Sequence, residues 1–182
     1  MATSMRATLA VPVNERDHVQ GPADAPVTLV EYGDFECPYC AAAHVVVNRV
    51  QEIMGDQLRF VFRHFPLTQI HPHAEAAAES SEAAGAQDRF WEMHDVLYEN
   101  QPMLDPIHLV TFAQELSLDV KRFTRELQEG IYREQVRADF LSGVRSGVNG
   151  TPAFFINGVR YDGSWDLPQL VEALSASIES RV

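Results

Sequence analysis

The stretch from residue 27 to residue 40 has the sequence VTLVEYGDFECPYC and decides the fold. It begins with a nearly continuous apolar run, which predicts a central β-strand over residues 27–32. It ends with Cys37-Pro38-Tyr39-Cys40, which contains the only two cysteines of the 182-residue chain. A helical pattern follows, from Pro38 to about Met54, with Gly55 as its stop. A Cys-x-x-Cys pair at a strand-to-helix junction is typical of a thiol–disulfide redox site.

The spacing of the two cysteines suits stepwise disulfide exchange. Cys37 is expected at the N-terminus of the helix, where unpaired backbone N–H groups and the helix dipole favour a thiolate. This position lowers the pKa of the thiol, and the thiolate is the nucleophile. Pro38 fits the first helical position, since its missing N–H would have no intrahelical partner there. Cys40 lies almost one turn further on, so we expect Cys37 to attack and Cys40 to resolve the mixed disulfide.

A structural zinc site is the alternative interpretation of the pair. Such a site usually has four Cys or His ligands, and the chain has no third cysteine. His71-x-His73 could supply further ligands in principle, but these two residues fit better at the start of a helix. The pattern therefore favours redox chemistry and no metal.

Composition sets the broad class. With 182 residues and 46% hydrophobic residues, the chain can form one domain that carries a sizeable insertion. A formal net charge of −12 argues against nucleic acid and against anionic membrane surfaces as partners. Residues 1–10 lack the apolar core of a secretory signal, and no run approaches the roughly 20 apolar residues of a membrane span. We expect a cytoplasmic protein, or a periplasmic or extracytoplasmic one if the N-terminus has been trimmed.

The patterns divide the chain into three parts. Residues 1–20 are expected to form an N-terminal arm, with a short edge strand around Leu9–Val13. Residues 21–65 contain the first strand, the helix and a second strand, which together make a βαβ unit with a right-handed crossover. Residues 66–147 show almost only helical periodicity and predict an inserted helical domain. Its helices are expected over residues 72–86, 90–98, 105–116, 119–127 and 131–144, the last with Val136, Phe140 and Leu141 inward.

Residues 148–182 complete the fold. Ala153–Ile156 has strand character, and Asn157-Gly158 is a strong signal for a two-residue hairpin turn. A return strand and a final helix capped by Asp166 follow. The order predicts an α/β fold, βαβ followed by ββα, with a mixed sheet and the helical insertion between the two halves.

Thr151-Pro152 directly precedes the Ala153–Ile156 strand. Proline lacks the N–H that a strand ladder would use, and an X–Pro bond is one of the few places for a cis peptide. A cis bond beside the cysteines would leave the backbone of Thr151 open to an extended substrate peptide. An ordinary turn proline remains the alternative from these residues alone.

The other polar residues near the cysteine pair differ in the role that we expect of them. Glu31 lies in the apolar first strand, so we expect it to be partly buried with a raised pKa, suited to accept a proton from Cys40. Asp34 and Glu36 lie nearer Cys37 and would oppose its thiolate unless they point away, and we expect them to add surface acidity and little else. His44 and His64 are expected to be satisfied core or surface histidines.

Taken together, these motifs resemble the DsbA-like branch of the thioredoxin superfamily. The resemblance rests on Glu31, on Cys37-Pro38-Tyr39-Cys40, on the helical block and on the segment 150–158. It implies a thioredoxin fold, protein dithiol–disulfide exchange and a cis Pro152 preceded by Thr151. It also implies Cys37 as nucleophile, Cys40 as resolving thiol and Glu31 as buried acid. The best-known periplasmic members have histidine in place of Tyr39, and this departure leaves the redox direction open.

We therefore expect a protein dithiol–disulfide oxidoreductase that works through Cys37 and Cys40. It would hold no bound organic cofactor, act on protein thiols or disulfides, and depend on an unidentified recycling redox partner. Glutathione is a candidate co-substrate, which makes a glutathione-dependent reductase or transferase the alternative within enzymes. A metal- or iron–sulfur-binding dimer is the alternative from another class, and a redox-inert binding module is disfavoured by the intact cysteine pair.

Overall fold

A five-stranded sheet carries the architecture in the computed structural model, which describes residues 7–180. The strand order is β1-β3-β2-β4-β5, with the predicted first strand, β2, at the centre. β2 is buried at every position except Thr28, which explains its apolar sequence. The pairs β1–β3, β2–β4 and β4–β5 are antiparallel. The strands are β1 (His18–Gln20), β2 (Val27–Gly33), β3 (Leu58–His64), β4 (Ala153–Ile156) and β5 (Val159–Tyr161).

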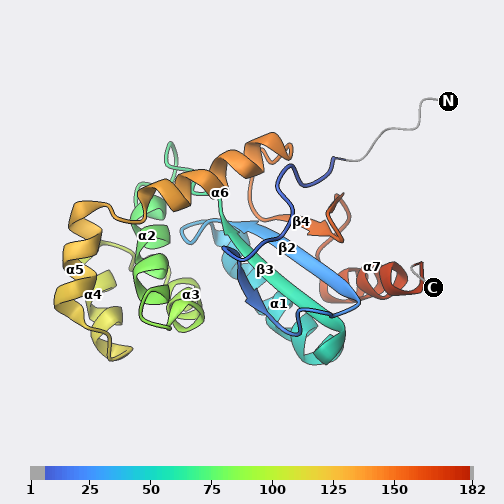
Figure 1. Cartoon of the computed structure of the whole chain (residues 1–182), viewed down its shortest axis with the longest axis horizontal. Helices are drawn as coiled ribbons and strands as arrows, with labels where there is room; N and C mark the ends of the chain where they lie inside the picture. The colour runs from blue at the N-terminus through green and yellow to red at the C-terminus, as the bar shows by residue number, and fades with distance from the viewer. Residues whose placement is uncertain (1–6, 181–182) are drawn as a thin grey trace. The chain divides into compact units, whose positions relative to one another are not determined.

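Helix α1 (Pro38–Met54) begins and ends where the sequence predicts. In Figure 1 it runs behind the strands of the sheet, and Ala43, Val47 and Val50 are buried. Gly55 follows with φ +52°, a conformation that residues with a Cβ rarely adopt, so the helix stops there.

The predicted hairpin between β4 and β5 is confirmed. Asn157 and Gly158 both have positive φ, 50° and 81°, as a type I′ turn requires. Asn157 also ties the turn to β2: its side-chain oxygen accepts from the N–H of Thr28 at 3.0 Å, and its own N–H donates to the Thr28 carbonyl at 2.9 Å. Helix α7 (Leu167–Glu179) follows, capped by Asp166 as predicted, with Leu170 and Leu174 buried.

The N-terminal arm differs from the prediction. The expected strand around Leu9–Val13 is wrong, since only Thr8 forms an isolated bridge, with Val159. The strand of the arm is instead β1, which pairs with β3. Part of the reason lies in the carbonyl groups of Val11 and Pro12, which accept hydrogen bonds from a side chain and not from a strand.

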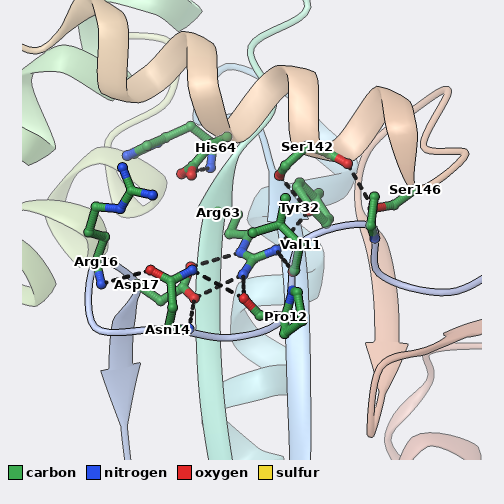
Figure 2. A network of polar contacts seen from close by, with 12 residues as sticks. Val11, Pro12, Asn14, Arg16, Asp17, Tyr32, Arg63, His64, Ser142 and Ser146 are labelled. Atoms are coloured by element: carbon green, nitrogen blue, oxygen red, sulfur yellow. Dashed lines mark hydrogen bonds and ion pairs between the residues drawn. The ribbon is translucent and has the colours of Figure 1, made fainter.

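That side chain is Arg63, which is 2% exposed and organises a buried polar network in Figure 2. Its guanidinium makes two bonds to the Asp17 carboxylate, at 2.7 and 2.9 Å. It also donates to the carbonyls of Val11 (2.8 Å) and Pro12 (3.1 Å) and to the Tyr32 hydroxyl (3.0 Å). Burial alone would lower the pKa of Arg63, but its bonds to Asp17 and Tyr32 outweigh burial and the pKa is raised.

The network continues into α6. The Tyr32 hydroxyl lies 2.7 Å from Oγ of Ser142, and Ser146 donates to the Ser142 carbonyl at 2.7 Å. Ser146 in turn accepts from the N–H of Ala10 at 2.9 Å. The expectation that Leu141 points inward is wrong, because it is 43% exposed while Ser142 takes the buried position.

Five helices make up the predicted insertion. Their caps follow the sequence: Asp105 accepts from two N–H groups of α4, and Asp119 accepts from the N–H of Arg122. Helix α2 is rich in alanine, and small side chains let α3, α4 and α5 pack against it. The helices are α2 (Ala74–Gly85), α3 (Phe90–Glu99), α4 (Pro106–Glu115), α5 (Val120–Glu129) and α6 (Arg133–Arg145).

Internal contacts group the chain into two compact units. Unit 1 holds the ranges Met1–Tyr32, Ala42–Arg63 and Leu141–Val182, and unit 2 holds Gly33–Ala41 and His64–Phe140. The redox motif therefore belongs to the same unit as most of the helical insertion. Across residues 7–180, no helix combines the length and the apolar character that crossing a membrane requires.

Candidate redox site

Cys37 occupies the N-terminal end of α1. Its carbonyl accepts from the N–H groups of Cys40 (3.1 Å) and Ala41 (3.2 Å), and its own N–H donates to the Asp34 carbonyl at 3.1 Å. Pro38 is the first helical residue. The first turn of α1 has no acidic residue, so the positive end of the helix dipole acts on Cys37 unopposed from within the helix.

The residues of the motif differ in their exposure. Cys37 is 4% exposed and Cys40 0%, whereas Tyr39 between them is 67% exposed. Both cysteines are therefore buried, and only the residue between them is largely exposed. The assignment of Cys37 as attacking thiol and Cys40 as resolving thiol stays a prediction.

Asp34 does not behave as the sequence suggested. The expectation of a surface charge is wrong, because Asp34 is 1% exposed. Its carboxylate accepts from the N–H groups of Glu36 and Leu67, both at 2.8 Å, and from Nδ1 of His71 at 2.7 Å. The backbone N–H of Asp34 points to Sγ of Cys40 at 3.5 Å. A buried carboxylate needs hydrogen-bond donors, and these three donors tie Asp34 to Glu36, Leu67 and His71, so Asp34 holds the loop before Cys37 in shape.

Two more side chains of unit 2 hold the same loop. Gln101, which follows α3, donates its amide N–H to the carbonyl of Cys37 at 3.2 Å and to that of Phe35. Glu36 accepts from the N–H of His73 at 2.7 Å. The two histidines considered as metal ligands thus lie against the redox loop, His71 by its ring and His73 by its backbone.

The remaining site residues belong to unit 1. Glu31 is 1% exposed on β2 and pairs with Phe154 of β4. Thr151 and Pro152 directly precede β4, and the Thr151–Pro152 peptide bond is cis, as expected. The functional roles of Glu31, Thr151 and Pro152 stay predictions. A second cis bond, Gln101–Pro102, was not anticipated.

The two histidines considered as proton carriers, His44 and His64, are both buried. His44 is 5% exposed, and its Nε2 lies 3.2 Å from the side chain of Asn48. His64 is 1% exposed, and its Nε2 lies 2.7 Å from the Glu82 carboxylate. The other oxygen of Glu82 accepts from Gln135 at 2.7 Å, so the pair is part of the buried polar framework of unit 2.

A sequence profile for a family described as Thioredoxin matches residues 13–178, almost the whole chain. The chain belongs to the thioredoxin family. The expected fold class is confirmed by that membership and by the structures below.

Several solved structures share the fold of this thioredoxin-family chain. Oxidised BdbD from Bacillus subtilis is 24% identical with a TM-score of 0.84, over 96% of this chain and 99% of that one. Alpha-DsbA1 from Wolbachia pipientis is 22% identical with a TM-score of 0.80, over 94% of this chain and 95% of that one. The DsbA-like resemblance is therefore confirmed at the level of the fold.

The relatives found by sequence comparison carry the names of antiporters, unlike the solved structures above. "Na(+)/H(+) antiporter NhaA 1" of Salinispora arenicola is 48% identical over 175 residues, which are 94% of this chain and 26% of that protein. "Na(+)/H(+) antiporter NhaA 3" of Salinispora tropica is 47% identical over the same shares. The chain thus spans about a quarter of the length of these curated relatives.

Proposed function

We propose that this protein is a dithiol–disulfide oxidoreductase that acts on protein thiols or disulfides through Cys37 and Cys40. The observation that carries the proposal is the place of Cys37 at the N-terminal end of α1, with its carbonyl bonded to the N–H groups of Cys40 and Ala41. A helix N-terminus stabilises a thiolate, and a resolving thiol lies within the first turn.

The exchange needs no bound organic cofactor in either direction. In oxidation, a substrate thiolate attacks Sγ of Cys37, the Cys37–Cys40 bond breaks, and Cys40 leaves as a thiolate. A second substrate thiolate then attacks the substrate sulfur of the mixed disulfide and releases Cys37, so two electrons pass from substrate to protein. In reduction the Cys37 thiolate attacks a substrate disulfide and Cys40 releases the substrate, with Glu31 proposed as proton acceptor for Cys40. Pro152 and Thr151 would present their backbone to the substrate.

The test uses one serine variant of each cysteine. Cys37→Ser should abolish exchange, whereas Cys40→Ser should trap substrates as mixed disulfides on Cys37. Non-reducing gels of both variants, incubated with a disulfide-containing protein, decide the assignment. Trapping by Cys37→Ser but not by Cys40→Ser would reverse the two roles.

The direction of thiol–disulfide exchange in the cell depends on the redox potential of the Cys37–Cys40 couple. Tyr39 brings no positive charge, and it is largely exposed. We propose a couple less oxidising than that of family members with histidine at this position, and a mostly reduced protein in the cytoplasm, because stabilising the thiolate is what makes a pair oxidising. Equilibration with glutathione buffers measures the redox potential of this couple. A strongly oxidising value would favour a periplasmic or extracytoplasmic location instead.

The alternatives are separable by simple assays. Turnover with glutathione but not with insulin would favour a glutathione-dependent reductase or transferase. A visible absorbance band or bound metal in anaerobically purified protein would favour a metal- or iron–sulfur-binding dimer.

We propose a Na⁺/H⁺ antiporter as a partner, because the relatives at 47–48% identity carry that name and contain a segment matching 94% of this chain. The test places this chain in the Salinispora arenicola antiporter in exchange for the matching segment and measures cation–proton exchange in vesicles. Exchange that responds to dithiothreitol, and no longer responds with Cys37→Ser, is expected. An unchanged response in the Cys37→Ser version would count against the partnership.

A further inference from the structure

The backbone around Cys37 is held by side chains that do not belong to the motif. The amide of Gln101 donates to the Cys37 carbonyl at 3.2 Å and to the Phe35 carbonyl. These carbonyls lie on both sides of Glu36, so one amide group fixes the path of the chain into α1. The donating end of an amide carries partial positive charge, and here that end is directed at the backbone carbonyls of Phe35 and Cys37.

Asp34 contacts the same backbone segment before α1, but its carboxylate carries negative charge, opposite to the partial positive charge of the Gln101 amide N–H. Its side chain is 0% exposed, so water does not screen its charge directly. Its backbone carbonyl accepts from the N–H of Cys37 at 3.1 Å, and its backbone N–H faces Sγ of Cys40 at 3.5 Å. The groups that face its carboxylate are the N–H of Glu36, the N–H of Leu67 and the ring of His71. Glu36 is the other carboxylate at the loop, and it is only half-buried.

We propose that Asp34 and Gln101 are positioning residues of the redox pair and set the acidity of the Cys37 thiol from opposite sides. The Asp34 carboxylate opposes the Cys37 thiolate, and the Gln101 amide supports it. Both also hold the loop that presents Cys37 at the helix N-terminus. This proposal rests on the proposed function, because it assigns how the same two cysteines are tuned.

Two charged variants at one position test the electrostatic part. Gln101→Glu should raise the pKa of the Cys37 thiol and Gln101→Lys should lower it, whereas Gln101→Ala should raise it by less than Gln101→Glu. The expected change is about tenfold in thiolate fraction for each charged variant, the effect of one pKa unit. A purely structural Gln101 would instead give shifts of the same sign in both variants. The readout is thiolate absorbance at 240 nm against pH, in protein that retains its native circular dichroism.

The control is Gln114, which is exposed on α4. Gln114→Glu and Gln114→Lys add the same charges away from the loop and should change the thiolate fraction by less than about twofold, since exposed charges are screened.

Asp34→Asn tests the proposed effect of the Asp34 carboxylate on the pKa of Cys37. It keeps a side-chain oxygen for one backbone N–H while removing the charge. It should lower the pKa of Cys37 and shift the equilibrium with glutathione towards the dithiol by about tenfold. If Asp34→Asn does not fold, the Gln101 pair still decides the inference.

The outcomes separate this inference from the proposed function. A wild-type protein without thiol exchange would overturn the function. An active wild-type protein whose Gln101 variants titrate alike, or whose Asp34→Asn variant leaves the Cys37 pKa unchanged, would overturn only the positioning roles.

Discussion

Arg63→Leu should destabilise the protein far more than the removal of an exposed charge. The change leaves the Asp17 carboxylate, whose side chain is only 5% exposed, without its two guanidinium bonds. Breaking a buried ion pair by removing one partner costs about 3–5 kcal/mol, because the remaining charge stays desolvated. The carbonyls of Val11 and Pro12 lose donors as well, at about 1 kcal/mol for each hydrogen bond.

We therefore expect a loss of about 5–7 kcal/mol, a large part of the 5–15 kcal/mol typical of a whole domain. Urea unfolding followed by circular dichroism measures it as a lower midpoint. Hydrogen exchange should locate it, since the backbone around Val11 and Asp17 loses its anchor first.

The matched control is Arg49→Leu. Arg49 pairs with Glu52 on the surface of α1, where both side chains are 60% exposed. Removing it should cost no more than about 0.5 kcal/mol, and added salt should erase that difference. A loss for Arg63→Leu as small as that for Arg49→Leu would refute the reasoning, because the buried network would then contribute no more than an exposed pair.

Three further changes test local features. Burial raises the pKa of Glu79 above its ordinary value, so the folded state holds this proton more tightly than the unfolded state, and stability falls as pH rises past about 4.5. The urea-unfolding midpoint of Glu79→Gln should therefore rise relative to that of the wild type between pH 4 and pH 7. A difference between the two midpoints that does not change with pH would contradict this. Asp119→Ala should cost about 1 kcal/mol by removing the cap of α5, while Asp119→Ser should retain most of it in the same unfolding assay. Gly158→Ala should cost about 1–2 kcal/mol in thermal unfolding because its φ is +81°, whereas Gly150→Ala, which meets open space, should cost less.

Local signals in the sequence located much of the fold. Pro38 and Gly55 bracket α1 because each acts on its own backbone, one at a helix start and one at a helix end. Asn157-Gly158 fixed both strands of the hairpin for the same reason. The cysteine pair needed only its spacing and its place between strand and helix.

Features that depend on distant partners could not be read in this way. Asp34 is buried because Leu67 and His71, 33 and 37 residues away, bring donors to its carboxylate. Arg63 is buried because Asp17, 46 residues away, accepts from it. A charged residue in a sequence predicts exposure until such a partner is known, and neither pairing leaves a periodic signal.

Asp34 and Glu36 show why this limit matters for the chemistry. They are two residues apart, carry the same charge and precede the same cysteine, so the sequence treats them alike. In the structure Asp34 is buried and bonded to three donors, while Glu36 is half-buried and accepts from the backbone of His73. A buried charge acts through a medium that screens it weakly, whereas a partly exposed one is screened by water and salt. We therefore expect the charge of Asp34 to affect a Cys37 thiolate more than that of Glu36 does, whereas a count of acidic residues near the motif would give both carboxylates equal weight.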